Sequence, residues 1–162
     1  VDNNTEDVTG ASAGQERGII DSNIYNDGTG ASVLTGGRRF SDSRSTDIFI
    51  HMDGQEVFKF AVKSVPTAIE TLLHNNNMNV NDVDKFILHQ ANVRIIESVA
   101  KRLKADKDKF PVNLNEYGNT SSASIPILLD ELNRNGSLKQ GEKLVLAGFG
   151  AGLSWGSILL VW

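Results

Sequence analysis

Apolar stretches of strand length alternate with amphipathic stretches of helix length along this chain, which restricts it to few folds. Residues 83–88 (VDKFIL) are apolar enough for a buried strand. Residues 91–104 follow almost directly and predict a helix, because their apolar residues recur at helical spacing. The apolar stripe consists of Ile96, Val99, Ala100 and Leu103, while Arg94, Glu97, Lys101 and Arg102 face outward. A strand that leads into a helix is the building unit of an α/β fold.

The same reasoning extends over the rest of the chain. Strands are expected at 48–52, 110–114, 143–149 and 157–162, and helices at 56–74 and across Ile125, Leu128, Leu129 and Leu132. Glycines at 28–30 and 36–37 predict turns. Pro66 predicts a kink or a break in the first helix, and Asn135-Gly136 predicts a left-handed helix end. This order predicts an α/β domain whose sheet is covered by helices on both faces.

Composition excludes several classes of function. The 162 residues include no Cys and three His, which excludes disulfides and thiolate metal sites in this segment and leaves little for a zinc site. The net charge is −4 with scattered Lys and Arg, whereas nucleic-acid-binding proteins carry a basic stripe. No apolar run approaches the ~20 residues that span a bilayer, and no secretory signal is recognisable. We therefore expect a cytoplasmic enzyme or part of one, with no metal, nucleic-acid or membrane partner.

The first 17 residues differ in character from the rest. They are polar and small and lack apolar periodicity, so they predict a loop or a disordered lead-in. A natural domain rarely begins in this way, which suggests that an upstream portion precedes it. We expect residues 18–162 to form the folded domain.

Polar residues follow the apolar strands at three places, and strand ends are where α/β proteins build sites. His89 comes directly after the strand at 83–88, at the start of a helix. The helix-end potential would favour a neutral imidazole, which can donate a hydrogen bond to a developing oxyanion or act as a base. The alternative is a hydrogen-bonded structural His.

The other two places are residues 117–124 and 148–156. Asn119 offers an uncharged N–H donor next to Gly118, which permits a sharp turn; alternatively, Asn119 caps a helix start rich in Ser and Thr. The glycines at 148–156 supply backbone N–H donors to an oxyanion, or they connect two core strands tightly. The lack of Gly-Lys-Ser/Thr excludes a phosphate loop here.

The chain contains GQEVFKFAV (54–62), HQANVRII (89–96), YGNTSSASIP (117–126) and GFGAGLSWGS (148–157), in this order. Together these segments resemble the C-terminal signatures of the type III β-ketoacyl-acyl-carrier-protein synthases, thiolase-like enzymes that initiate bacterial fatty-acid synthesis. The resemblance covers roughly residues 18–162. It implies a homodimer whose subunits contain two similar α/β halves, each with a five-stranded mixed sheet. This chain would be the C-terminal half.

The resemblance also implies roles for individual residues. His89 and Asn119 would be the catalytic His and Asn of a Cys-His-Asn site whose Cys lies in the missing N-terminal half, and Gly150 and Ala151 would belong to the oxyanion loop. Substrate and coenzyme A would contact Gly54, Phe58, Ala91, Asn92 and Arg94. The acyl carrier protein would contact Gln90, Ala91, Asn92, Val93 and Arg94, extended by Lys59, Lys101 and Arg102. From the residues alone, a solvated helix face is the alternative for Arg94, Lys101 and Arg102.

The implied activity is an acyltransferase reaction, the decarboxylating condensation of a short acyl-CoA with malonyl carrier protein, without a permanently bound cofactor. Without its Cys the fragment is expected to be inactive by itself. Two alternatives stay open: a relative that transfers or decarboxylates without condensing, and a non-catalytic domain that binds carrier protein.

Two departures from the family pattern stand out. Ala151 replaces the middle glycine of three, and its Cβ narrows the backbone geometry. The Gly-Asp-Gly-Ala-Gly opening of the family's second half is not recognisable in residues 1–14.

Overall fold

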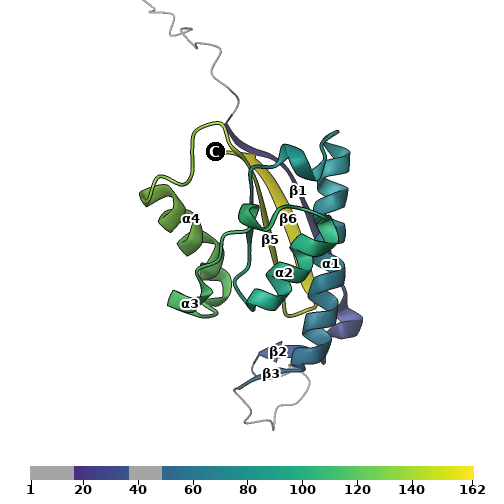
Figure 1. The fold of residues 1–162 in the computed structure, drawn as a ribbon. Helices are drawn as coiled ribbons and strands as arrows, with labels where there is room; N and C mark the ends of the chain where they lie inside the picture. The colour runs from purple at the N-terminus through teal and green to yellow at the C-terminus, as the bar shows by residue number, and fades with distance from the viewer. Residues whose placement is uncertain (1–16, 37–48) are drawn as a thin grey trace, which may run out of the picture.

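The computed structural model describes residues 17–36 and 49–162. Within these ranges the chain forms six strands and four α-helices (Figure 1). In chain order they are β1 (Gly18–Asn26), β2 (Leu34–Gly36), β3 (Ile50–Met52), α1 (Gly54–Asn75), β4 (Lys85–Leu88), α2 (Val93–Leu103), α3 (Leu114–Tyr117), α4 (Ser124–Arg134), β5 (Lys143–Gly150) and β6 (Ser154–Val161). The predicted lead-in at 1–17, apart from Arg17, and the turn residues after Gly36 lie outside the described residues.

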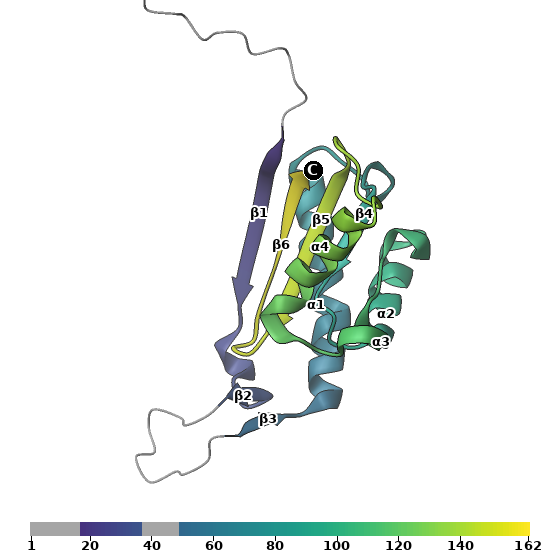
Figure 2. The same ribbon diagram turned by 90° about the vertical axis from the view of Figure 1, so that its left-hand side faces the viewer.

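The main sheet has the strand order β1-β6-β5-β4. It is mixed, because β4 and β5 run parallel whereas β6 is antiparallel to both β5 and β1. Helices α1 and α2 lie on one face and α4 on the other, as the turned view shows (Figure 2). The expected α/β architecture with helices on both faces is therefore confirmed. The described residues supply four strands to this sheet, not the five that the resemblance implied.

Two hydrophobic clusters hold the helices against the sheet, and β4 contributes to both. Phe86 and Leu88 point into the cluster under α1 and α2, whereas Ile87 points into the cluster under α4. All three side chains are at most 3% exposed. Successive side chains of a strand alternate between faces, so an unbroken apolar run is what a strand covered on both sides requires.

The predicted helices are confirmed, with boundaries that differ by a few residues. Helix α1 begins at the N-cap Asp53, whose carboxylate accepts hydrogen bonds from the N–H groups of Gln55 and Glu56. Pro66 is buried inside α1, and the helix continues through it without the expected break. Helix α4 ends before Gly136, whose φ of +74° is the predicted left-handed ending. None of the described helices is both long and apolar enough to cross a membrane.

The strand expected at 110–114 is wrong. Phe110 packs its ring against Phe86, with centroids 4.6 Å apart, and Leu114 already begins α3. The N–H of Asn113 donates to the side-chain oxygen of Gln90 at 3.3 Å instead of joining a ladder. Pro111 has no N–H to offer. The apolar character of this segment reflects the burial of the Phe110 ring. It does not reflect a strand, because the backbone hydrogen bonds are not those of a strand.

The strand β1 was not predicted, because its polar residues are part of the packing. Asn23 donates to the carbonyl of Ala68 in α1 at 2.8 Å and accepts from the N–H and hydroxyl of Ser157. Asp21 similarly accepts from Asn76 at the end of α1. Polar side chains thus occupy the face of β1 that packs against α1, where an ordinary strand would carry apolar side chains. The opposite face carries Ile24, which is 78% exposed.

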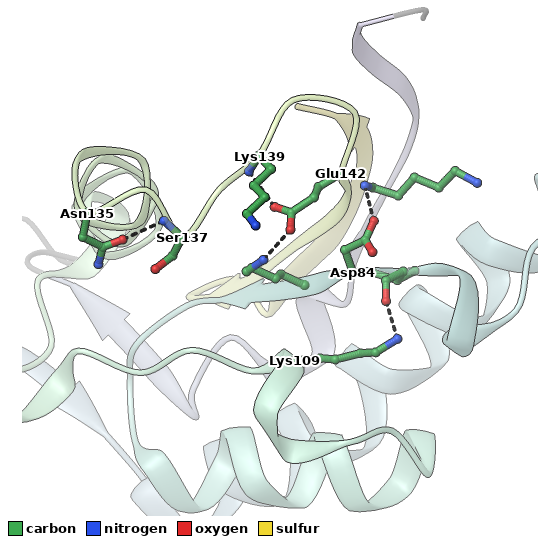
Figure 3. A network of polar contacts seen from close by, with 9 residues as sticks. Asp84, Lys109, Asn135, Ser137, Lys139 and Glu142 are labelled. Carbon is green, nitrogen blue, oxygen red and sulfur yellow. Dashed lines mark hydrogen bonds and ion pairs between the residues drawn. The ribbon is translucent and has the colours of Figure 1, made fainter.

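A polar network closes the end of the sheet where β4 and β5 begin (Figure 3). Lys85 and Glu142 form an ion pair at 2.8 Å, and Glu142 also accepts from the N–H of Lys139 at 2.9 Å. Asp84 accepts from the N–H of Lys143 at 2.8 Å. These contacts set the register of the two parallel strands from their amino ends and leave the opposite ends free for a site.

Candidate active site

The candidate site lies where the parallel strands β4 and β5 end. His89 follows β4 directly, and its backbone N–H donates to the carbonyl of Ala147 in β5 at 2.9 Å. Gly150 ends β5, and Asn119 lies in the segment between α3 and α4. The carboxyl ends of parallel strands meet at one edge of a sheet, so segments far apart in sequence converge there.

The imidazole of His89 has defined neighbours on two sides. Its Nδ1 lies 2.7 Å from the hydroxyl oxygen of Ser124, the first residue of α4. Its ring meets the ring of Phe149 edge-on, with centroids 5.3 Å apart. Burial lowers the pKa of His89, so the neutral form is favoured. The expected neutral imidazole is therefore supported, but burial is the cause, because α2 begins only at Val93.

Asn119 uses the two ends of its side chain differently. Its Oδ1 accepts a hydrogen bond from the N–H of Ser121 at 2.9 Å, which matches the turn-stabilising alternative. Among the described residues no hydrogen bond engages its amide nitrogen, so two N–H donors stay available. Gly118 next to it has a φ of +65° with ψ of −158°, a conformation that side chains disfavour. This glycine allows the sharp turn that carries Asn119 to the surface of the site.

A cavity of about 510 Å³ brings the predicted residues together. His89, Asn119, Gly150 and Ala151 all line it, although they come from three separate segments. Its remaining lining is largely apolar: Leu34, Ile50, Met52, Val57, Ala91 and Phe149, with Thr35, Gly36 and Ser121. His89 also lines an adjoining cavity of about 390 Å³ next to Ile24 and Trp155. The arrangement offers N–H donors inside a mostly apolar pocket, where hydrogen bonds to a developing negative charge are strongest.

Ala151 fits the loop between β5 and β6 without strain. It is exposed, and its φ is not positive, so its Cβ is compatible with the backbone. The next residue, Gly152, has a φ of +137°, a value that L side chains rarely adopt. The loop therefore needs its glycine at 152 and tolerates an alanine at 151.

The residues expected at the substrate entrance fall into two groups. Ala91 lines the larger cavity. Arg94 lies over the ring of Phe58, 5.9 Å from its centroid, which joins the starts of α1 and α2. Asn92 accepts from the N–H of Arg94 as the N-cap of α2, and Gly54 is the first residue of α1. Gly54, Phe58, Asn92 and Arg94 do not line the described cavities.

Gln90 has to be removed from the expected carrier-protein contacts. Its side chain is 1% exposed, donates to the carbonyl of Leu88 and accepts from the N–H of Asn113. A buried amide with both ends bonded is a structural tie between two loops, and it offers nothing to a partner. Val93, Lys101 and Arg102 are exposed on α2, and Lys59 is exposed on α1, where it pairs with Glu56 at 2.7 Å.

Sequence reasoning named the segments 117–124 and 148–156 but gave no role to two residues within them, Ser124 and Phe149. Ser124 was one small residue in a Ser-rich stretch, and Phe149 was one apolar residue in a predicted strand. Both contact the imidazole of His89, through a hydrogen bond and through the ring edge respectively. No spacing rule points to either, because each contact joins segments at least 35 residues apart. Among the described residues no cluster of three or more His, Cys, Asp or Glu could hold a metal ion.

Comparison with known proteins gives the family context. Residues 73–162 match the family described as 3-Oxoacyl-[acyl-carrier-protein (ACP)] synthase III C terminal. The beta-ketoacyl-[acyl-carrier-protein] synthase III of Clostridium acetobutylicum is 45% identical over 155 residues, covering 92% of this chain and 48% of that protein. The protein of the same description from Pyropia yezoensis is 54% identical over 113 residues, covering 70% of this chain and 35% of that protein.

Solved structures agree. The 3-oxoacyl-[acyl-carrier-protein] synthase III from Aquifex aeolicus superposes with a TM-score of 0.83 at 35% identity, covering 93% of this chain and 46% of that chain. The synthase III from Thermus thermophilus also gives 0.83, at 38% identity, covering 90% of this chain and 46% of that chain. The thiolase-like fold expected from the motifs is thereby confirmed. The chain spans about half the length of the relatives it matches.

Proposed function

The chain belongs to the 3-oxoacyl-[acyl-carrier-protein] synthase III family, and we propose that it supplies the His and Asn of a condensing acyltransferase site. The nucleophilic Cys of that site comes from polypeptide outside these 162 residues, which contain no Cys. The observation that carries the proposal is the shared cavity: His89 and Asn119 line one largely apolar pocket together with Gly150 and Ala151.

The chemistry needs donors that stay uncharged. A short acyl group is first transferred from acyl-CoA to the Cys thiolate, with the coenzyme A thiolate leaving. Malonyl carrier protein then loses carbon dioxide, and the electron pair of the broken C–C bond delocalises onto its thioester oxygen. His89 and Asn119 donate hydrogen bonds to that oxygen. The burial that lowers the pKa of His89 supports this role, because a neutral imidazole is favoured.

The condensation step follows from the same geometry. The enolate carbon attacks the acyl-Cys carbonyl, a new C–C bond forms, and the Cys thiolate leaves to give a 3-ketoacyl carrier protein. With the N-terminal half in place, the apolar side chains of the lining would limit the access of water, which would otherwise protonate the carbanion. Acyl-CoA acts as a substrate, and the scheme requires no resident cofactor.

The carrier protein docks, in this proposal, on the surface formed by Asn92, Val93, Arg94, Lys101 and Arg102 of α2 and the neighbouring Lys59. The last helical turn of α2 adds Lys101 and Arg102 about 12 Å from Arg94 along the helix axis. Carrier proteins are acidic, so these cations would raise the association rate. Arg94 is the best placed of these cations, because its guanidinium is held over the ring of Phe58, 5.9 Å from the centroid, where the starts of α1 and α2 meet. Lys59 already shares its charge with Glu56.

The complete enzyme is proposed to be a cytoplasmic homodimer with an N-terminal half that carries the Cys. The relatives support only the N-terminal half of this proposal, because the chain covers about half of their length. The exposed Ile24 and the adjoining groove along Ile125, Leu146 and Ile158 provide an apolar face on which such a half could pack.

The experiment joins the N-terminal half of the Clostridium acetobutylicum relative to residues 18–162 and measures 3-ketoacyl product from acyl-CoA and malonyl carrier protein. His89→Ala and Asn119→Ala should each lower the rate about 10²- to 10³-fold, as expected for loss of one oxyanion donor. Asn115→Ala, an exposed Asn in α3, is the matched control and should leave the rate unchanged.

Three results would contradict the proposal. One is condensation that survives His89→Ala or Asn119→Ala at the parent rate. Another is acyl transfer or carbon dioxide release with no 3-ketoacyl product, which would support a non-condensing relative. The third is product from the 162 residues alone, which should form none; such product would show that the Cys is dispensable.

A further inference from the structure

The hydroxyl of Ser124 contacts two groups in the segment that follows β4. Its oxygen is 3.2 Å from the backbone nitrogen of Gln90 and 2.7 Å from Nδ1 of His89. Ser124 begins α4 and is 2% exposed, so its hydroxyl is largely shielded from bulk water although the residue borders the smaller cavity. Among the described residues these are the only hydrogen-bond partners of its side chain.

The direction of each hydrogen bond follows from what the groups can do. The N–H of Gln90 can only donate, so the oxygen of Ser124 accepts there. The hydroxyl proton of Ser124 then needs an acceptor, and Nδ1 of His89 is the remaining partner. If Nδ1 carried a proton instead, it would donate to Ser124, and a buried hydroxyl proton would be left without an acceptor. Buried donors are rarely left in that state.

The Gln90 contact is itself fixed. The side chain of Gln90 donates to the carbonyl of Leu88 at 2.8 Å and accepts from the N–H of Asn113 at 3.3 Å. Asn113 is tied in turn to Glu131 of α4 at 2.8 Å. The backbone N–H of Gln90 therefore cannot turn away from Ser124 without breaking a buried network, and one lone pair of the hydroxyl stays committed.

We propose that Ser124 is a positioning residue that holds neutral His89 in the tautomer protonated at Nε2. The inference rests on the proposed function for its consequence: an Nε2–H group makes His89 a hydrogen-bond donor to the thioester oxygen, whereas an Nδ1–H tautomer would present a lone pair and repel it. Asn119 supplies an N–H of its own, so with Ser124 in place both His89 and Asn119 would donate hydrogen bonds to the same oxygen. The hydroxyl of Ser124 thus determines whether Nε2 of His89 acts as a hydrogen-bond donor or as a base.

The test reads the tautomer directly and needs no turnover. The 162-residue protein is labelled with ¹⁵N-histidine, His89 is assigned with His89→Gln, and long-range ¹H–¹⁵N spectra locate the proton above the pKa of the imidazole. The wild type should show a proton on Nε2 alone. A proton on Nδ1, or a mixture of both tautomers, in the folded wild type would overturn the proposal whatever the variants do.

Two variants extend the test. Ser124→Ala should admit the Nδ1–H tautomer, and Ser124→Thr, which keeps the hydroxyl, should restore the wild-type signature. An unchanged single tautomer in folded Ser124→Ala would contradict the role of the hydroxyl. In the chimaeric enzyme, Ser124→Ala should lower kcat about tenfold, the loss expected for one hydrogen bond, with KM unchanged. Should condensation fail altogether while the tautomer result holds, the proposed function fails and this inference stands.

Discussion

The ring of Phe149 stands edge-on to the imidazole of His89, with the two centroids 5.3 Å apart. Phe149 also meets Phe60 of α1 edge to face and packs against the larger core cluster. The imidazole is therefore held by the core on one side and by the hydroxyl of Ser124 on the other. A side chain held in this way loses little entropy when a ligand binds, which favours catalysis by fixed donors.

The first prediction concerns water access to His89. Phe149→Ala should raise the pKa of His89 towards its usual value, because burial is what lowers this pKa and the truncated side chain admits water. The pKa is measured by NMR titration of the imidazole Cε1 proton. Phe60→Leu is the control, since Phe60 touches Phe149 but makes no ring contact with His89. An equal rise in both variants would show that general loosening of the core is the cause.

The second prediction concerns stability against pH. The folded-state pKa of His89 is lowered, so as pH falls the unfolded chain takes up this proton first. The contribution of His89 to stability is therefore present above its unfolded pKa of about 6.5 and is lost as pH falls towards the folded pKa. Urea unfolding at about pH 7.5 and pH 5.5 should show a smaller pH dependence in His89→Gln than in the wild type. An identical dependence would argue against a perturbed imidazole.

The third prediction concerns the ion pair in Figure 3. Burial alone would raise the pKa of Glu142, but the hydrogen bonds from Lys85 and from the N–H of Lys139 outweigh it and lower the pKa. The pair is about four-fifths buried, with side-chain exposures of 20% and 19%. Glu142→Gln should reduce the free energy of unfolding at neutral pH by about 1–2 kcal/mol. The contribution should vanish as pH falls through the folded pKa of Glu142, because the carboxylate is then protonated.

Glu56→Gln is the matched control for this ion pair. It breaks the Lys59–Glu56 pair, whose length is similar but whose side chains are 59% and 49% exposed. Solvent screens an exposed ion pair, so the effect of Glu56→Gln on the free energy of unfolding should be the smaller one. Urea denaturation measures the free energy of unfolding of both variants. A larger loss in Glu56→Gln than in Glu142→Gln would contradict the stabilising role of the Lys85–Glu142 pair.

The fourth prediction concerns two glycines that face each other in β5 and β6. Gly148 and Gly156 are paired opposite each other in the antiparallel strands β5 and β6. A Cβ on Gly156 would lie 2.5 Å from the carbonyl oxygen of Asn23 in β1. Gly156→Ala should push β1 away and lower the free energy of unfolding by about 1–3 kcal/mol. Gly148→Ala meets only Ile125 at 3.8 Å, so it should be neutral or slightly stabilising. Thermal unfolding of the two variants should rank them in that order.

The fifth prediction concerns carrier-protein docking. Arg94→Glu in the chimaera should raise KM for malonyl carrier protein about tenfold and leave kcat unchanged, because the charge acts before chemistry. The difference should shrink at high salt, since exposed charges are screened. Arg134→Glu, at the end of α4 where Arg134 pairs with Asp130, makes the same charge change elsewhere and should have little effect. A fall in kcat alone would place Arg94 in the chemistry instead of the docking.

The amino-acid sequence alone determined most of the regular secondary structure. Apolar periodicity is a local property, so it located β4, β5, α1 and α2, and it placed His89 at a strand end. The four motifs identified the family and the residues His89 and Asn119. Ala151 appeared in the sequence as a departure, and the structure shows that its backbone conformation suits an alanine.

The tertiary structure alone decided which polar groups are enclosed and by what. It gave β1 its place, because Asn23 is satisfied by Ala68 and Ser157, groups that lie 45 and 134 residues away. It buried Gln90 and set Ser124 against His89 through contacts between residues 23 and 35 positions apart. A polar residue looks the same in sequence whether water or a distant partner satisfies it. Only the folded chain, by removing the water, settles which of the two applies.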